Sequence, residues 1–242
     1  MIDISLSKKL SFTFQSAYPY PHIVIDNFIQ DSLLGKSSDE MNSFEYFGFD
    51  GTTYSAEHQV NKFFTPWCEN NIKDVMYAAP ATYKLMTYFN SPEFMSYIEE
   101  LSGIKNLIPD NSFYGGAVHK LTNGGKLDIH ADYTLHPINQ TYRRLTMLIY
   151  MNKDWNKSWG SDLELWNTNM TKCVKKIEPI FNRMVLFNVA HNTFHGHPHP
   201  LNCPDSVNRL SYSICYFTKD KSKDYTEDYL GAYWQELPKN SK

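Results

Sequence analysis

The sequence predicts a mainly β domain of the α+β class, with a jelly-roll core and supporting helices in its N-terminal part. From about residue 108 onward, short apolar runs alternate with turn residues, and no helical periodicity separates them. That pattern favours a sandwich or barrel over a doubly wound sheet. No internal repeat or linker divides the 242 residues, so we expect a single domain.

The N-terminal part combines one strand with helices. Residues 19–28 contain a β-branched run typical of an entry strand, and Asp31 is predicted to cap a helix that starts just after it. Residues 82–101 carry apolar side chains three and four positions apart, which indicates helices. Ser91 followed by proline predicts a second helix start within this segment, and Gly103 predicts its end.

The C-terminal part is predicted to be a set of strands. The clearest are residues 145–151, 161–166, 183–189 and 210–217. Between them, residues 123–126 (Asn-Gly-Gly-Lys) have the composition of a hairpin turn. The expected division is therefore an N-terminal layer at 1–107, a jelly roll at 108–220 and a C-terminal tail at 221–242 that packs on it.

Composition favours a soluble cytoplasmic protein. Apolar residues make up 42% of the chain, enough for a large core, and the net charge of −3 gives no electrostatic argument for binding nucleic acid or an anionic membrane. The four cysteines form no CxxC pair, and we expect reduced thiols. There is no apolar signal segment at the start and no run long enough to span a bilayer.

The first chemical motif is His130-Ala131-Asp132. On a strand, side chains two residues apart point to the same face, so His130 and Asp132 can bind one metal ion together. Two histidines and one carboxylate on one face of an octahedron leave positions open for a co-substrate and O₂, which is typical of non-haem Fe(II) oxygenases. Zinc more often takes a tetrahedral set with one open site.

The third ligand is expected from the histidine-rich segment 194–200. His195, His197 and His199 are all candidates on residue type alone. His195 is favoured because Gly196 follows it and lets the backbone pass close to a metal, whereas a proline follows each of the other two.

Arg209 opens the strand 210–217, fourteen residues after His195, and Ser211 lies on the same face of that strand. A guanidinium group can hold a carboxylate with two hydrogen bonds. An arginine that points into a barrel needs an anionic partner, and the distal carboxylate of 2-oxoglutarate would supply one. The alternative is a surface arginine with a solvated head group.

These residues resemble the prolyl 4-hydroxylase-like 2-oxoglutarate/Fe(II) oxygenases over most of the chain, in the order typical of that family. The matching segments include PYPHIVIDNF (19–28), HADY (130–133), RRLTMLIYMNKDW (143–155), FHGHPHPL (194–201) and RLSYSICYF (209–217). The resemblance implies a double-stranded β-helix with His130, Asp132 and His195 as metal ligands.

The resemblance also implies a co-substrate pocket. Arg209 takes the place of the residue that binds the 5-carboxylate of 2-oxoglutarate, Tyr150 assists it, and Leu163 lines the pocket beside Ser211. Two features depart from the family pattern. Lys120 stands where some relatives have a tyrosine, and the spacing of fourteen residues exceeds the usual ten, which an insertion at 200–208 would explain.

The implied activity is hydroxylation of an unactivated C–H bond with Fe(II), 2-oxoglutarate and O₂, and with ascorbate as an accessory reductant. A prolyl residue of a peptide or protein is the expected substrate. The sequence leaves open a small molecule, free amino acid or sugar as substrate, a non-catalytic jelly-roll binding module, and a zinc hydrolase that uses the histidine-rich loop. Residues 48–66 are a candidate lid over the site.

Overall fold

In the computed structural model, the described residues are 7–44, 57–64, 72–114, 116–223 and 225–238. The helices are α1 (Ser7–Gln15), α2 (Asp31–Ser43), α3 (Ile72–Ala78), α4 (Pro80–Phe89), α5 (Pro92–Ser102) and the 3₁₀ helix η3 (Lys157–Trp159). The strands are β1 (His22–Ile25), β2 (Gln59–Phe64), β3 (Ile108–Pro109), β4 (Ala117–Ala131), β5 (Tyr142–Tyr150), β6 (Leu163–Trp166), β7 (Cys173–Ile177), β8 (Met184–Asn188), β9 (His195–His197), β10 (Arg209–Thr218) and β11 (Tyr233–Trp234).

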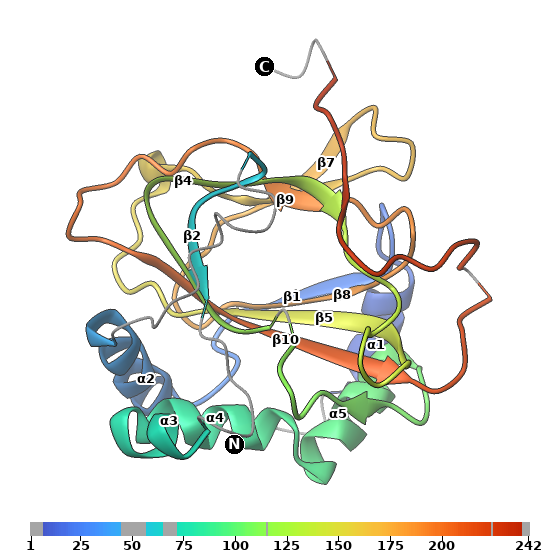
Figure 1. Cartoon of the computed structure of the whole chain (residues 1–242), viewed down its shortest axis with the longest axis horizontal. Helices are drawn as coiled ribbons and strands as arrows, with labels where there is room; N and C mark the ends of the chain where they lie inside the picture. The colour runs from blue at the N-terminus through green and yellow to red at the C-terminus, as the bar shows by residue number, and fades with distance from the viewer. Residues whose placement is uncertain (1–6, 45–56, 65–71, 115, 224, 239–242) are drawn as a thin grey trace.

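The strands form two layers of a jelly roll, which confirms the predicted fold class. Their order is β1-β8-β5-β10-β4-β9-β6-β7, and all the pairings are antiparallel. Figure 1 shows β1, β8, β5 and β10 as the lower layer, with helices α2 to α5 beneath it, and β9 and β7 in the upper layer. The helices therefore cover one face of the lower sheet and leave its other face toward the barrel interior.

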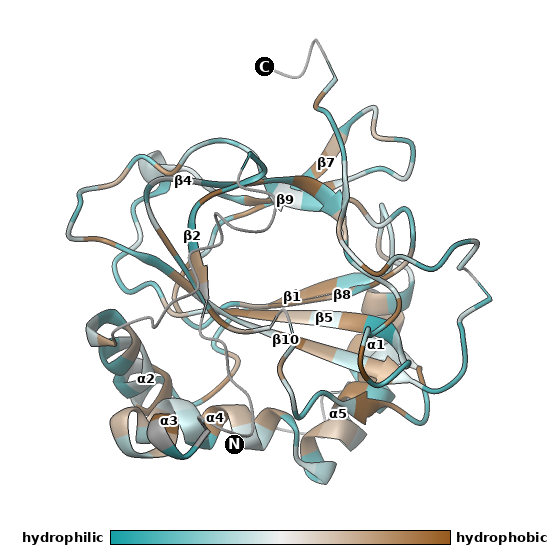
Figure 2. Cartoon of the chain, viewed as in Figure 1, coloured by the Kyte–Doolittle hydropathy of each residue, from teal (hydrophilic) through white to brown (hydrophobic). Residues whose placement is uncertain are grey.

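The alternation along β10 separates these two faces. The side chains of Leu210, Tyr212, Ile214 and Tyr216 belong to the large apolar cluster shared with the helices. Figure 2 shows many brown, apolar residues along these strands and along the helices beneath them. Because successive side chains of a strand point to opposite faces, Arg209 and Ser211 point the other way, into the barrel.

Helix α5 follows the predicted capping pattern. The hydroxyl of Ser91 accepts a hydrogen bond from the backbone N–H of Phe94 at 3.2 Å, Pro92 is the first residue of the helix, and Gly103 ends it with φ of 78°. The predicted cap at Asp31 is wrong. Asp31 is already the first residue of α2, Gln30 precedes it without a side-chain cap, and the Asp31 carboxylate accepts from Asn182.

Strand β4 connects the two layers. Its first half pairs with β10 and its second half with β9, so the strand bends between them (Figure 1). The predicted hairpin turn at residues 123–126 is therefore wrong, since these residues lie within β4. Gly124 has φ of 76°, the conformation that an Asn-Gly turn favours, but here it serves a bend within one strand.

Two further strands lie along the free edge of β4. Strand β2 pairs with it from Gln59 to Phe64, and β11 pairs with it at Tyr233 and Trp234. The candidate lid at 48–66 is thus a strand over 59–64, while 48–56 and 65–66 lie outside the described residues. In the C-terminal tail, the N–H of Gln235 donates to the carbonyl of Ile129 at 2.8 Å.

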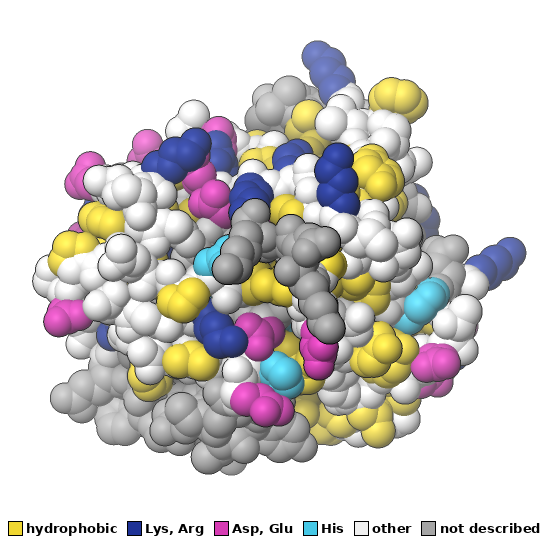
Figure 3. Space-filling view, turned by 90° about the horizontal axis from the view of Figure 1, so that it is seen from above, with side chains coloured by type: hydrophobic (Ala, Val, Ile, Leu, Met, Phe, Trp, Pro, Cys, Tyr) yellow, Lys and Arg dark blue, Asp and Glu magenta, His cyan; other side chains and the backbone are white. Residues whose placement is uncertain are grey.

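The surface carries charges of both signs. On the face seen in Figure 3, acidic and basic side chains are interspersed with apolar ones. Among the described residues, no helix is long and apolar enough to cross a bilayer. The described cysteines, Cys173, Cys203 and Cys215, are all free thiols.

Candidate metal and co-substrate site

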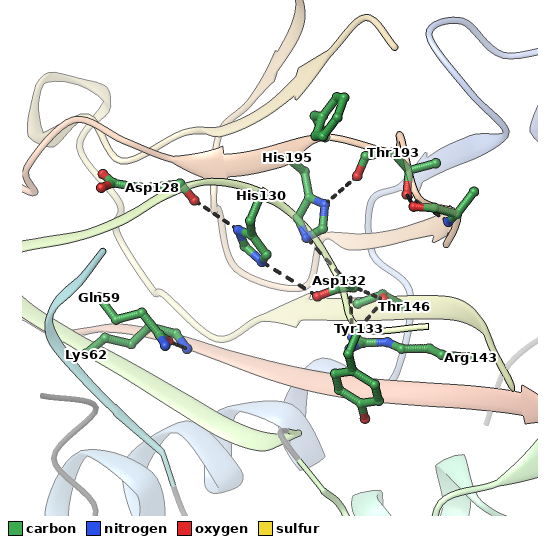
Figure 4. A network of polar contacts seen from close by, with 12 residues as sticks. Gln59, Lys62, Asp128, His130, Asp132, Tyr133, Arg143, Thr146, Thr193 and His195 are labelled. Atoms are coloured by element: carbon green, nitrogen blue, oxygen red, sulfur yellow. Dashed lines mark hydrogen bonds and ion pairs between the residues drawn. The ribbon is translucent and has the colours of Figure 1, made fainter. Parts of the chain in front are cut away.

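His130, Asp132 and His195 lie together inside the barrel. His130 is near the end of β4, Asp132 directly follows that strand, and His195 opens β9 opposite His130 in the register. One potential ligand atom from each residue lies within 4.8 Å of the other two, and all three side chains are buried. Nε2 of His130 is 3.6 Å from Oδ1 of Asp132, and Nε2 of His195 is 3.7 Å from Oδ2 (Figure 4).

Backbone carbonyls orient both imidazole rings. Nδ1 of His130 lies 2.9 Å from the carbonyl oxygen of Asp128, and Nδ1 of His195 lies 3.0 Å from that of Thr193. A carbonyl only accepts hydrogen bonds, so each Nδ1 donates and each Nε2 presents a lone pair to the centre of the group. Burial lowers the pKa of His195 to about 4, which keeps this ring neutral and able to bind a metal at pH 7.

Arg143 and Thr146 hold the carboxylate of Asp132. Nη2 of Arg143 lies 3.0 Å from Oδ2 of Asp132, and the Thr146 hydroxyl donates to the same oxygen at 2.9 Å. Burial raises the pKa of Asp132, but the charge of Arg143 and the interactions with His195 and His130 together outweigh burial and hold the pKa well below its usual range. Asp132 is therefore ionised, with Oδ1 on the side of His130.

Arg209 lies on the inward face of β10 and is 3% exposed. Its Nε donates to the carbonyl of Ser161 at 3.2 Å, and its guanidinium carbon lies 5.0 Å from the ring centroid of Tyr150. Among the described residues, no carboxylate forms an ion pair with Arg209. Burying an arginine without a carboxylate partner is costly, so this position favours an anionic ligand.

Three buried polar atoms near Arg209 also have no hydrogen-bond partner within the described part of the chain. They are the Tyr150 hydroxyl, Oγ of Ser161 and Nδ1 of His197. Such atoms are rare in folded proteins and are usually satisfied by a ligand or water. Leu163 packs in the same apolar cluster as Tyr150, and Ser211 is paired with Tyr150 across β10 and β5. The predicted pocket residues therefore lie together.

The donor set fits the chemistry of ferrous iron and a dicarboxylate. Two imidazoles and one carboxylate match the ligand types of non-haem Fe(II) sites, and the buried guanidinium matches a carboxylate. Residues 116–218 match the model of the 2OG-Fe(II) oxygenase superfamily, and this range contains all three candidate ligands and Arg209. This part of the chain is a 2OG-Fe(II) oxygenase domain.

Solved structures show the same fold. A prolyl hydroxylase from Trichoplax adhaerens, in complex with a peptide fragment of the hypoxia inducible factor oxygen degradation domain, matches with a TM-score of 0.61. The identity is 20%, and the match covers 88% of this chain and 91% of that one. A prolyl-4-hydroxylase from Pseudomonas putida matches with a TM-score of 0.54 at 12% identity, over 89% of this chain and all of the other.

A third similar structure binds a different type of molecule. HygX from Streptomyces hygroscopicus, with nickel, 2-oxoglutarate and hygromycin B bound, matches with a TM-score of 0.57 at 11% identity. The match covers 92% of this chain and 96% of HygX. This chain thus shares its fold with a prolyl hydroxylase that has a peptide bound and with a protein that has a small molecule bound.

Two residues that the sequence singled out, His199 and Lys120, lie away from the group formed by His130, Asp132 and His195. The exposed His199 side chain has its Nε2 3.8 Å from Glu164. Lys120 is paired with Leu210, whose side chain faces the helices, so Lys120 lies on the outer face of β4. The inward residue at that point is Leu121, opposite Arg209.

Sequence reasoning missed three residues near the site. Arg143 belongs to no motif that connects it with the ligands, yet it pairs with Asp132. Trp234, from β11, has its ring centroid 4.9 Å from that of His130 and stacks on His58 at 4.6 Å. Lys62 of β2 is 6% exposed, and its charge interacts with those of Asp132 and Arg209. No motif in the sequence connects Trp234 or Lys62 with the ligands, because pairing along β4 brings them there.

Proposed function

We propose that the oxygenase holds Fe(II) through His130, Asp132 and His195 and binds 2-oxoglutarate with its far carboxylate on Arg209. The observation that carries this proposal is the buried Arg209, which has no carboxylate partner among the described residues. It lies in the same barrel as the two imidazoles and the carboxylate of the candidate metal site. A site for a metal alone would not need this guanidinium group.

When bound, Fe(II) would couple the oxidative decarboxylation of 2-oxoglutarate to succinate and CO₂ with insertion of the second oxygen atom of O₂ into a C–H bond. The protein's part is to bind and orient. Backbone carbonyls fix the two imidazole rings, and Arg143 with Thr146 fixes Asp132. Tyr150 and Ser211 face the same space as Arg209 and would complete the grip on the far carboxylate, with Leu163 as the apolar wall.

The proposed substrate is a prolyl residue in a peptide or protein. Support comes from the sequence resemblance and from the prolyl hydroxylases that share the fold. A small molecule is the second candidate, because HygX shares the fold and has hygromycin B bound. A non-catalytic binding module and a zinc hydrolase are less well supported, since neither explains an anion site beside an Fe(II)-type ligand set.

The first test is uncoupled turnover. The protein is incubated with Fe(II), 2-oxoglutarate, O₂ and ascorbate, and succinate is measured without any prime substrate. The wild type should form succinate slowly, and Asp132→Ala should form none. Asp205→Ala should match the wild type, because Asp205 is an exposed turn residue whose carboxylate accepts a hydrogen bond from the Asn123 side chain. Equal succinate from Asp132→Ala and the wild type would overturn the proposal.

The second test addresses the substrate. Proline-containing peptides and a panel of small metabolites are incubated under the same conditions and examined by mass spectrometry for the gain of one oxygen atom. Hydroxylation of a peptidyl proline supports the proposed substrate. Hydroxylation of a metabolite alone would favour the second candidate.

A further inference from the structure

A bulge in β2 turns the side chain of Lys62 into the barrel. The register between β2 and β4 shifts between Val60 and Lys62, and Asn61 between them has φ of 46°. Without this shift, residues three positions apart on a strand point to opposite faces. With it, the amine of Lys62 donates to Oε1 of Gln59 at 3.0 Å, and the two side chains lie on one face of β2 (Figure 4). Bulges beside functional sites often redirect a side chain in this way.

The register places Lys62 level with Arg209. Lys62 is paired with Leu121 of β4, and Leu121 is paired on its other side with Arg209 of β10. Directly paired residues point to the same face of a sheet, so the three side chains form one row across three strands. Neighbouring strands lie about 4.8 Å apart, so the Cα atoms of the two cations are roughly 10 Å apart. Both cations are buried.

His197 borders the same space from β9. It lies two residues after His195 and therefore on the same, inward face of that strand. His197 is paired with Leu127, and Leu127 is paired on its other side with Gln59, which forms a second row across three strands. The His197 side chain is buried, and its Nδ1 has no hydrogen-bond partner within the described part of the chain. Such an atom is usually satisfied by a ligand or water, so this row also borders a place for a ligand.

The Lys62 amine is a cation inside this space. Burial lowers its pKa to about 8, so most of the amine is protonated at pH 7. Its charge interacts with that of Asp132 and with that of Arg209. Burial is the main cause of the low pKa of His197, and the charges of Arg209 and Lys62 lower it further. These interactions agree with the register, which brings the three side chains into one enclosed pocket.

The far carboxylate of 2-oxoglutarate needs more donors than Arg209 supplies. A carboxylate has about four acceptor sites, and a guanidinium that binds it with two hydrogen bonds fills two of them. In a buried pocket the others also need donors. Tyr150 lies on the β5 side of Arg209, and Lys62 lies on the β4 side. Donors on both sides can therefore surround a carboxylate that Arg209 holds.

We propose that Lys62 is a second cation for the far carboxylate of 2-oxoglutarate, which it binds together with Arg209. This inference rests on the proposed function. It makes β2 part of the co-substrate pocket, although the strand lies outside the matched residues 116–218, and it gives the bulge at Asn61 a role. Two cations at the far end make the pocket select a 2-oxo dicarboxylate over a 2-oxo monocarboxylate.

The test is ligand binding to protein loaded with Mn(II). Two ligands are compared: 2-oxoglutarate, and 2-oxopentanoate, which has the same chain length but lacks the far carboxylate. Affinity for 2-oxoglutarate is measured by isothermal titration calorimetry, and binding of 2-oxopentanoate by the rise in Tm at high ligand concentration. The variants are Lys62→Met, Arg209→Met and, as the matched control, Lys120→Met, a lysine on the outer face of β4. Circular dichroism and Mn(II) affinity show that each variant is folded and loaded.

Lys62→Met should weaken 2-oxoglutarate binding by about tenfold or more, the range for loss of a charged hydrogen bond, and should respond to 2-oxopentanoate like the wild type. Arg209→Met should show the same selective loss, and Lys120→Met should bind both ligands like the wild type.

An affinity of Lys62→Met for 2-oxoglutarate within about twofold of the wild type would overturn the inference. So would an equal loss for both ligands, because such a loss does not depend on the far carboxylate. Absence of 2-oxoglutarate binding by the wild type, or wild-type affinity in Arg209→Met, would instead overturn the proposed function.

Discussion

Replacing Arg143 by methionine removes the cation that neutralises Asp132 inside the barrel. The pair is buried, with Nη2 of Arg143 3.0 Å from Oδ2, and the same Nη2 donates to the Thr146 hydroxyl at 2.9 Å. Breaking a buried ion pair by removing one partner costs about 3–5 kcal/mol. Since domains of this kind are stable by about 5–15 kcal/mol, Arg143→Met should lose a large fraction of the free energy of unfolding.

The measurement is urea unfolding of the metal-free protein in the presence of a chelator. Thr146→Val, which keeps the shape but loses the donor to Asp132, should cost about 1–3 kcal/mol. Arg144→Met is the matched control. Its guanidinium makes one long hydrogen bond of 3.4 Å to Thr218, so the loss should stay within about 1 kcal/mol.

Adding Mn(II) should restore part of the stability of Arg143→Met, because a divalent ion replaces the missing positive charge beside Asp132. Equal losses of stability for Arg143→Met and Arg144→Met in the metal-free state would contradict this role of Arg143. So would a smaller stabilisation of Arg143→Met than of the wild type by Mn(II) when the ion binds to both proteins.

Three further predictions concern the pocket and its supports. Tyr150→Phe should weaken 2-oxoglutarate binding by about threefold to tenfold. It should leave the unfolding free energy of the metal-free protein unchanged, since the hydroxyl has no hydrogen-bond partner in the described part of the chain. A loss of stability without a loss of affinity would contradict this prediction. Lys62→Met should stabilise the metal-free protein at pH 7 by roughly 3 kcal/mol, from a pKa of about 8 in place of 10.5. Below pH 8 the folded wild type carries the full cost of the buried charge. Between pH 8 and 10.5 the unfolded wild type binds more protons than the folded wild type, so the wild type gains stability as the pH rises and its difference in unfolding free energy from Lys62→Met should close. A difference that stays constant over this range in urea unfolding would contradict the prediction. Gly196→Ala should lower both stability and Mn(II) affinity, because a Cβ would lie 2.7 Å from the carbonyl oxygen of Asp128; normal melting and calorimetry would disprove the clash.

The sequence predicted the parts of the fold that follow local patterns. The strand alternation, the cap at Ser91 and the glycine end of α5 all depend on residues close together in the chain, and all agree with the structure. His130 and Asp132 were predictable in the same way, since both lie at the end of one strand.

The predictions failed where distant strands decide the outcome. The sequence alone could not single out Arg143, because strict strand alternation from Thr146 turns Arg144 inward, whereas the register between β5 and β10 shifts beside Phe217, which is paired with Arg143. The Asn-Gly signal at 123–126 indicated a turn, whereas pairing of β4 with two different strands converts it into a bend. Gly196 also has a role that the sequence could not show, because it lets β9 pass close to the backbone of Asp128.

The cation from β2 shows the same limit. Lys62 is separated from His130 by a long stretch of chain, and only the pairing of β2 with β4 places it at the pocket. Arg209 could be singled out because it begins an apolar strand after the histidine-rich segment, but its lack of a carboxylate partner among the described residues is a property of the folded barrel.

The identity of the three ligands is tested most directly by titrating Mn(II) into the metal-free protein by calorimetry. The wild type, His197→Ala and His199→Ala should each bind one ion per chain. His195→Ala should bind the ion at least about a hundredfold more weakly, since it loses one of the three ligands. Wild-type affinity in His195→Ala, or loss of the ion in His197→Ala alone, would contradict the proposed ligand set.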